Sequence, residues 1–439
     1  MQSTDSNILI NPAYLQACQT RALWLDDDVV GQYRQQALQY FQSHGLPTRS
    51  DERWKYARLT DLAKQRFTAP QQPEAWSELP CATLPGAVSL CVIDGQLHMS
   101  VSDRKRLPQG VEVTSLSDLS CEQLAYYQQQ LASLADTKQS FMQMNMALCH
   151  TGFLLQVKAG VHCDVPIEIV HYQTAQQQPL HHHVHQLVCL EDGASATVFE
   201  RFYSAPDLSY FNNVLTQLDL CHSANLTYYK LQGESEQSHH IANTVVTQQQ
   251  KSEFSGVLLA QGGVYSRDQI EWQFKGRDAI SHFKSVLVAK QAQQIELYTQ
   301  VSHTTSHCRS DQDIRTVLSD RANVTCHNDI YVTAGSSHTD AQLQNRNLLL
   351  SDQAKINTKP ALEIYHDDVK CSHGATIGCL DEQAMFYLQS RGLSESQAKS
   401  LLLNAFYSQI IDGVAPEEIR QLMQSSVGQF SVEQGGEHE

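Results

Sequence analysis

The segments 191-EDGASATVF-199 and 221-CHSANLTYY-229 share one pattern, in which a polar turn leads into a small residue and then into alternating apolar residues. Alternation with a period of two is typical of a β-strand. The same pattern returns in 249-QQKSEFSGV-257, 276-GRDAISHFK-284, 319-SDRANVTCH-327 and 351-SDQAKINTK-359. The chain therefore contains a repeated unit that is built on short strands.

The small residues of this unit give its period. They are Ala194, Ala224, Ser252, Ala279, Ala322 and Ala354, at spacings of 30, 28, 27, 43 and 32 residues. A period near 30 with two or three short strands per unit favours a solenoid of stacked strand coils, in which the small residue occupies a tight inward corner. A β-sandwich also has a strand about every 8–12 residues, so this second fold stays open on the pattern alone.

A helical pattern precedes the strand zone. One face of it, within residues 10–70, carries Leu15, Leu23, Val30, Tyr33, Ala37 and Phe41. The pair His44-Gly45 followed by Pro47 predicts the end of this helix. Residues 121–148 also have a helical pattern, whereas 66–86 are polar and contain prolines, which is typical of a loop.

A second helical pattern follows the strands. Ala384, Tyr387 and Leu388 share one face before Gly392, and Ser394 with Gln397 predicts the start of the next helix. We expect four parts, which are an N-terminal helical region with a linker (1–148), a strand core (149–378), a C-terminal helical domain (379–430) and a disordered tail (431–439). Helical regions at both ends would cover the open coils of a solenoid.

Composition excludes several classes of function. The net charge of −16 disfavours nucleic-acid binding, which needs a basic surface. No apolar run is long enough for a transmembrane helix, and the first residues lack the pattern of a signal peptide. We therefore expect no membrane association and a cytoplasmic location, where the 12 cysteines would be thiols.

Motifs of self-contained enzymes are missing. The sequence has no phosphate-binding Gly-x-x-x-x-Gly-Lys-[Ser/Thr] loop, no His-Glu-x-x-His, no Gly-x-Ser-x-Gly and no Cys-x-x-Cys. These absences favour a scaffold or binding protein over a catalyst, and we expect no enzymatic activity.

Cysteine and histidine stand side by side at 149–150, 162–163, 221–222, 307–308 and 326–327. Neighbours on a strand point to opposite faces, so each pair predicts one core residue and one outer residue. Cys371 and His373 are two residues apart and would share a face, where thiolate and imidazole suit iron or zinc. For the segment His181–His185, a solvated loop and a metal-binding patch both stay open.

The surroundings of Cys371 carry further expectations. Lys370 is close enough in sequence to lower the pKa of the thiol, and Asp367 and Asp368 could orient the imidazole or add a hard ligand. Two ligands do not complete a metal site. The remaining ligands would have to come from elsewhere in the chain or from a second subunit.

Two long motifs carry a resemblance to a known family. The segment 370-KCSHGATIG-378 followed by 380-LDEQAMFYLQSRGL-393, together with 45-GLPTRSDERWKYARLTDL-62, resembles the signatures of the SufB/SufD family of iron–sulfur cluster assembly scaffolds. The N-terminal motif is more similar to the SufD branch than to the SufB branch. The resemblance covers nearly the whole chain.

The resemblance implies a fold and a set of partners. The fold is a right-handed parallel β-helix flanked by N-terminal and C-terminal helical domains. The implied function is that of a non-catalytic subunit that pairs with SufB through the end of the β-helix, binds the SufC ATPase and supports iron entry. Without SufB, the chain could pair with itself.

The resemblance also assigns residues. Cys371 and His373 would contribute to a transient iron or iron–sulfur cluster shared with SufB, with no permanently bound cofactor. Phe386, Tyr387, Arg391 and Gly392 would bind SufC. Three alternatives stay open, namely a SufB-like paralogue, a β-helix lyase and a metal-binding protein that uses the histidine-rich segment.

Overall fold

A computed structural model of the chain describes residues 28–65, 67–68, 80–175 and 178–436. The predicted helical positions Leu15 and Leu23, part of the predicted loop and the last three residues of the predicted tail lie outside this part. In the described part, no helix is long and apolar enough to cross a membrane.

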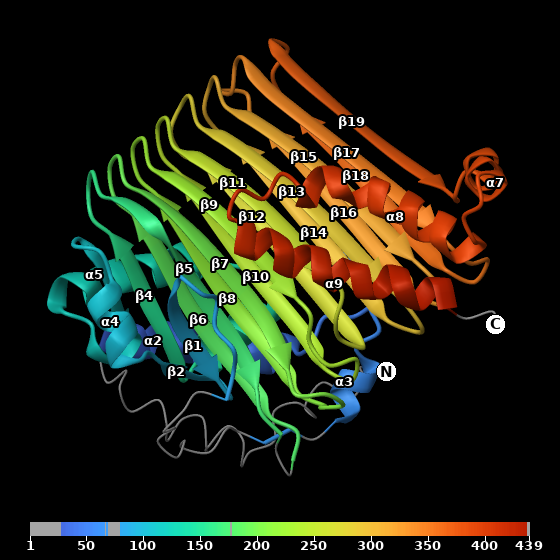
Figure 1. Cartoon of the computed structure of the whole chain (residues 1–439). Helices are drawn as coiled ribbons and strands as arrows, with labels where there is room; N and C mark the ends of the chain where they lie inside the picture. The colour runs from blue at the N-terminus through green and yellow to red at the C-terminus, as the bar shows by residue number, and fades with distance from the viewer. Residues whose placement is uncertain (1–27, 66, 69–79, 176–177, 437–439) are drawn as a thin grey trace.

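Two long sheets form the body of the protein (Figure 1). The ten-stranded sheet contains β2 (Gln96–His98), β1 (Val88–Ile93), β5 (His162–Gln173), β7 (Ser195–Ser204), β9 (Asn225–Gln232), β11 (Glu253–Ala260), β13 (Ile280–Ala289), β15 (Arg309–Leu318), β17 (Thr339–Leu349) and β19 (Val369–Gly378), in this order. The nine-stranded sheet contains β3 (Val111–Ser115), β4 (Thr151–Val157), β6 (His181–Leu190), β8 (Phe211–Leu220), β10 (His239–Gln248), β12 (Tyr265–Phe274), β14 (Gln294–His303), β16 (Asn323–Val332) and β18 (Lys355–Ile364).

From β4 onward, consecutive strands alternate between the two sheets, and each strand pairs in parallel with the strand two places later. The chain therefore winds as a parallel β-helix, which confirms the solenoid and excludes the sandwich. Apolar side chains from both sheets meet inside it, among them Val198, Leu258, Leu287 and Ile330. Stacking in register places residues of like character above one another and so builds one continuous core.

The small residues of the repeat do occupy buried corners, but they belong to two sheets. Ala279 directly precedes β13 of the ten-stranded sheet, whereas Ala322 directly precedes β16 of the nine-stranded sheet. The long spacing of 43 residues marks this change of sheet. Within the ten-stranded sheet the next corner is Cys308, which lies 29 residues after Ala279, directly precedes β15 and is also buried.

The N-terminal helices pack on the outer face of the nine-stranded sheet. They are α2 (Asp28–His44), η3 (Glu52–Trp54), α3 (Thr60–Lys64), η4 (Leu116–Asp118), α5 (Cys121–Leu134) and α6 (Ser140–Leu148), whereas α4 (Val101–Arg106) contacts β1 of the ten-stranded sheet. Phe41 and Phe141 share a buried cluster with Phe211 and Ile241 of the sheet. As predicted, α2 ends at His44, and Gly45 follows with a φ of 68°.

The N-terminal region is not purely helical, which corrects the expectation for 1–148. β1, β2 and β3 come from this region and extend both sheets at their N-terminal ends. The reason lies in 88-VSLCVI-93, an apolar run that is buried throughout and pairs in parallel with β5.

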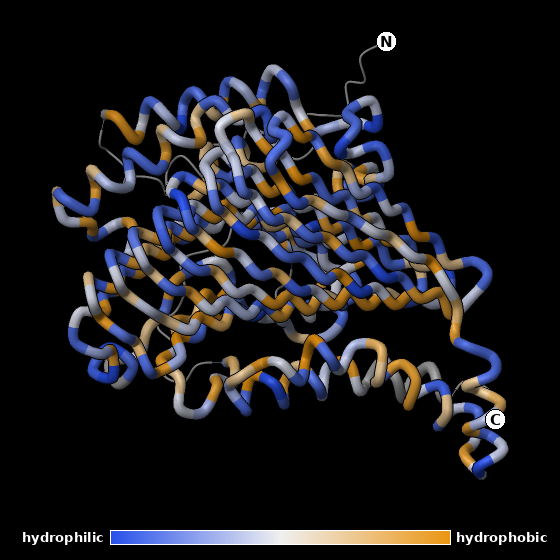
Figure 2. The backbone as a smooth tube through the Cα atoms, turned by 90° about the horizontal axis from the view of Figure 1, so that it is seen from above, coloured by the Kyte–Doolittle hydropathy of each residue, from blue (hydrophilic) through white to orange (hydrophobic). Residues whose placement is uncertain are grey.

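The C-terminal helices are α7 (Glu382–Ser390), α8 (Glu395–Ile411) and α9 (Glu417–Gly436). The predicted capping box of Ser394 and Gln397 opens α8. Leu403 and Tyr407 pack against Val286 and Val317 on the outer face of the ten-stranded sheet. Figure 2 shows this helical layer, which leads to the C-terminus, along one side of the strands.

The predicted tail begins too early. Helix α9 continues to the glycine pair 435–436 instead of ending at 430, because the single interior glycine, Gly428, costs a helix only about 1 kcal/mol and does not end it. Only residues 437–439 follow the helix.

Candidate functional site

The C-terminal end of the β-helix is the candidate site. Its last coil consists of β18 and β19, and each of these strands has a partner on one side only, β16 for β18 and β17 for β19. Figure 1 shows β19 at the outermost edge of the stack. An edge strand presents unpaired backbone groups and is therefore a template for pairing with another chain.

Cys371 and His373 both lie on the inner face of β19. In the register with β17, Cys371 stands opposite Ala341 and His373 opposite Leu343, and both of these partners are buried in the core. Residues directly opposite each other on parallel strands point to the same face. Because no further coil covers them, Cys371 is only half-buried and His373 is exposed.

The predicted effect of Lys370 on the thiol is wrong. Burial raises the pKa of Cys371 above its ordinary value, and the carboxylate of Asp340 adds to this rise, while a backbone hydrogen bond from Ala341 opposes it. Lys370 stands opposite Asp340 and lies on the other face of the strand, because neighbouring residues alternate. The thiol of the isolated chain is therefore not activated.

The two aspartates before β19 contact other histidines. Asp368 Oδ2 lies 3.0 Å from His338 Nδ1, and Asp367 Oδ1 lies 3.6 Å from His366 Nδ1. The described residues contain no group of three or more histidine, cysteine, aspartate or glutamate side chains arranged to hold a metal ion. Cys371 and His373 therefore provide two possible metal ligands at the uncovered C-terminal end of the β-helix.

The sequence analysis did not predict that the C-terminal end of the β-helix is apolar. Ile356 and Leu362 of β18 pack on the core from the last coil, while Ile364 is 40% exposed and Ile377 of β19 is 55% exposed. Each strand from β4 to β17 is followed by a further coil, which covers the side chains on its inner face. The signal in the sequence was the alternation of Cys371, His373 and later Ile377 on one face, which continues the core pattern to the last strand.

The histidine-rich segment lies elsewhere and corrects an expectation. His181, His182, His183 and His185 are all buried in β6, so this segment is not a solvated loop; His182 faces the interior of the β-helix and the other three face the N-terminal helices. His181 and His183 contact each other at 3.1 Å, and His185 Nε2 contacts Gln217 Oε1 at 2.9 Å. Burial lowers the pKa of His182 to about 3 and that of His185 to about 4, which keeps both rings neutral at pH 7.

The adjacent cysteine–histidine pairs follow the prediction. Cys163 and Cys308 are buried, whereas His162 and His307 are exposed. Cys326 is likewise buried beside a half-buried histidine. The alternation of strand faces accounts for the pairs 162–163 in β5 and 326–327 in β16, whereas 307–308 lies in the turn before β15.

The four residues expected to bind an ATPase lie on or just after α7, beyond the end of β19. Phe386 is 74% exposed and Tyr387 is 56% exposed. The guanidinium of Arg391 lies 5.2 Å from the centroid of the Tyr387 ring. Gly392 has a φ of 95°, a conformation that glycine adopts readily and other residues rarely do. The helix therefore presents two aromatic rings and a cation to the outside.

These features define the class of the protein as a parallel β-helix with helices on its outer faces and one uncovered end that is partly apolar. Two family models match the chain. The SufBD core domain of the SUF system for FeS cluster assembly matches residues 171–406, and the SufBD protein N-terminal region matches residues 14–169.

The chain is similar to characterised relatives along most of its length. It is 30% identical to the iron–sulfur cluster assembly protein SufD of Escherichia coli, over 90% of this chain and 92% of that protein. It is 28% identical to an iron–sulfur cluster assembly SufBD family protein of Synechocystis, over 91% of each. It is 25% identical to the chloroplastic protein ABCI7 of Arabidopsis thaliana, over 87% of this chain and 82% of that protein. The chain belongs to the SufBD family and is a SufD-type iron–sulfur cluster assembly protein.

Proposed function

We propose that this chain is a non-catalytic subunit of a SufB–SufC–SufD assembly scaffold and that its open β-helix end pairs with SufB. The observation that supports this most is the unpaired last coil, whose inner row carries an exposed imidazole, a half-buried thiol and exposed isoleucines. A second β-helix of the same cross-section would cover this row and pair its edge strands.

Cys371 and His373 would supply half of the ligands for a nascent cluster, and SufB would supply the rest. A thiolate and an imidazole are suitable donors for iron. Because burial raises the pKa of the Cys371 thiol, metal binding there has to displace a proton. Iron and sulfide are cargo in this proposal, so the chain alone would bind neither permanently.

SufC would dock on α7 through Phe386, Tyr387, Arg391 and Gly392. Two exposed aromatic rings beside an arginine are typical of the residues that carry binding energy at interfaces. A cytoplasmic location and the absence of enzymatic activity in the isolated chain stay predictions. Self-association of the chain in the absence of SufB stays a prediction as well.

Reconstitution of the complex tests the shared site. The chain is co-expressed with SufB and SufC, the complex is purified, and iron and acid-labile sulfide are measured after reconstitution. We expect the His373→Ala variant to assemble the complex normally and to retain far less cluster. The matched control is His222→Ala, which removes an exposed histidine at a turn far from the last coil.

Full cluster content in His373→Ala would remove this histidine from the site. Binding of SufC alone is tested with Phe386→Ala and Arg391→Ala, against Arg106→Ala on the N-terminal helix α4. Unchanged SufC binding in both α7 variants would count against the docking surface.

A further inference from the structure

The N-terminal segment 45–62 contains side chains of two kinds, those that attach it to the nine-stranded sheet and those that face outward. It crosses the outer face of this sheet as an irregular strap with one short helical turn, η3. The contacts of each side chain separate the two kinds.

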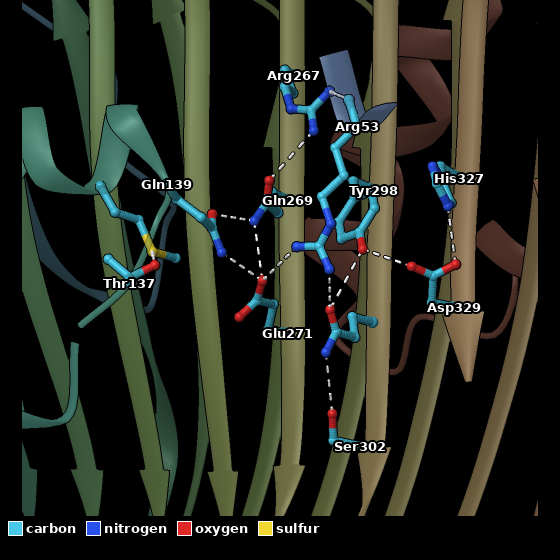
Figure 3. Close-up of polar contacts among 12 residues, drawn as sticks. Arg53, Thr137, Gln139, Arg267, Gln269, Glu271, Tyr298, Ser302, His327 and Asp329 are labelled. Carbon is cyan, nitrogen blue, oxygen red and sulfur yellow. Dashed lines mark hydrogen bonds and ion pairs between the residues drawn. The ribbon is translucent and has the colours of Figure 1, made fainter. Parts of the chain in front are cut away.

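Two arginines and two aromatic rings attach the segment. The guanidinium of Arg267 on β12 lies 3.8 Å from the centroid of the Trp54 ring and donates a hydrogen bond of 3.1 Å to the carbonyl of Arg53. Arg53 in turn lies 4.6 Å from the centroid of the Tyr298 ring on β14 and donates a hydrogen bond of 2.8 Å to Gln300 (Figure 3). These contacts explain why the segment needs Arg53 and Trp54.

Other cations of the segment have no such role. Arg49, Lys55 and Arg58 are exposed, and among the residues that the structure describes no carboxylate lies within ion-pair distance of them. The whole chain carries 47 acidic against 31 basic residues, so exposed cations that form no ion pair are unusual here. The attachment of the segment does not account for them.

Two of these cations border a cleft of about 240 Å³. Its floor is made of Leu46, Pro47, Trp54 and Leu59, and its rim carries Arg49 and Arg58. The described residues that line it include no aspartate or glutamate. An apolar floor with guanidinium groups at its edge combines a pocket for an apolar side chain with donors that suit a carboxylate.

We propose that this Arg49–Arg58 cleft docks an acidic segment of a partner protein, in which one apolar side chain enters the cleft and carboxylates on either side meet the two arginines. A peptide fits better than a nucleic acid or an anionic membrane. The exposed Asp51 and Asp61 are close in sequence to the two arginines and would repel a long row of phosphates, whereas a short peptide meets only the two arginines. The proposal does not depend on the assembly of an iron–sulfur cluster.

Fluorescence anisotropy with the full chain tests the proposal. The probe is a fluorescein-labelled dodecapeptide that alternates glutamate with leucine around one tryptophan. We expect saturable binding that weakens about tenfold or more in the R49E/R58E variant, equivalent to at least ~1.4 kcal/mol. The matched control R104E/K105E makes the same change of charge on α4 and should bind like the unchanged chain, because α4 does not line the cleft.

Three further probes complete the experiment, namely the same peptide with lysine in place of glutamate, a glutamate dodecapeptide without apolar residues, and either a short single-stranded RNA or phosphatidylserine vesicles. We expect none of them to match the first peptide. Failure of the acidic apolar peptide to bind the unchanged chain, or equal loss in both double variants, would overturn the proposal. RNA or vesicle binding that is lost in R49E/R58E would instead assign the cleft to phosphates and would overturn it as well.

Discussion

The guanidinium of Arg315 on β15 donates a hydrogen bond of 2.8 Å from Nη2 to the side-chain oxygen of Gln409 on α8. Its Nη1 donates to the carbonyl of Phe406 on the same helix, and its Nη2 lies 3.0 Å from Asp313. One buried side chain therefore ties the C-terminal helices to the outer face of the ten-stranded sheet. It is a polar contact in a mostly apolar interface, to which the hydrogen bond from the Ala415 N–H to the Tyr229 hydroxyl also belongs.

Replacement of Arg315 by methionine should loosen this layer. The loss removes its hydrogen bonds to the Phe406 carbonyl and the Gln409 side chain and takes the cation away from Asp313, and we expect the free energy of unfolding to fall by about 2–4 kcal/mol. Amide hydrogen exchange across α8 and α9 should accelerate. The control is Arg346→Met, whose side chain is 41% exposed against 6% for that of Arg315, and for which the loss should stay below about 1 kcal/mol. Unchanged exchange in α8 would contradict this role of Arg315.

The buried pair of Arg267 and Glu296 should show strong coupling. Both side chains are nearly inaccessible to solvent, and Arg267 also stacks on Trp54. Arg267→Met alone leaves a buried carboxylate without its cation, and we expect a loss of about 3–5 kcal/mol. The double variant, which also carries Glu296→Met, should lose less free energy of unfolding than Arg267→Met alone. Denaturant unfolding of the four chains in this cycle measures the coupling, and strict additivity would show that the pair does not interact.

Cys371 should react slowly with iodoacetamide in the isolated chain. It is half-buried and burial raises the pKa of its thiol, so its thiolate fraction at pH 8 is below that of an ordinary cysteine. Peptide mass spectrometry should find Cys121 and Cys379, which are both exposed, modified first. A thiol with a raised pKa loses its proton only at higher pH. Labelling of Cys371 should therefore increase steeply between pH 8 and 10. If Cys371 were labelled as fast as Cys379 at pH 8, the prediction of a slow thiol would be wrong.

Stability should fall below about pH 6.5. Burial lowers the pKa of His182 and His303 to about 3 and that of His185 and His239 to about 4. The unfolded chain takes up protons at these histidines near pH 6.5 while the folded chain does not, so acid favours unfolding. The stabilisation is fully present above about pH 6.5 and is lost as pH falls towards 4. Each such histidine changes the free energy of unfolding by up to about 1.4 kcal/mol per pH unit in this window.

Urea midpoints at pH 8, 7, 6 and 5 measure this dependence. The midpoint should be nearly constant from pH 8 to 7 and should drop from pH 6 to 5. His303→Gln should have a shallower drop, because it removes one of the four histidines and glutamine does not titrate. A midpoint that rises or stays level towards pH 5 would show that these rings are protonated in the folded chain.

The sequence predicted features that depend on local periodicity. The helix face with Val30, Ala37 and Phe41 is buried as expected, because a period of 3.6 residues fixes which side of a helix is apolar. The shared face of Cys371 and His373 followed from the period of two in a strand. The end of α2 at His44 followed from glycine and proline.

Features that depend on what packs over a strand were not predictable in this way. Four histidines between 181 and 185 form a polar stretch in the sequence, yet they are buried because the N-terminal helices cover one face of β6 and the opposite sheet covers the other. The small residues that mark the repeat precede strands of two different sheets. The sequence did not reveal this, since the corners before the strands of both sheets have the same composition.

The amino-acid sequence by itself determined that the chain forms stacked short strands between two helical regions, because alternation and turn residues act over a few neighbouring positions. Only the tertiary structure decided that the stack ends at β19 with an uncovered inner row, and that burial and Asp340 raise the pKa of the Cys371 thiol. The physical reason is that exposure of a strand depends on whether another coil lies beside it, and this is settled by register between residues about 30 positions apart.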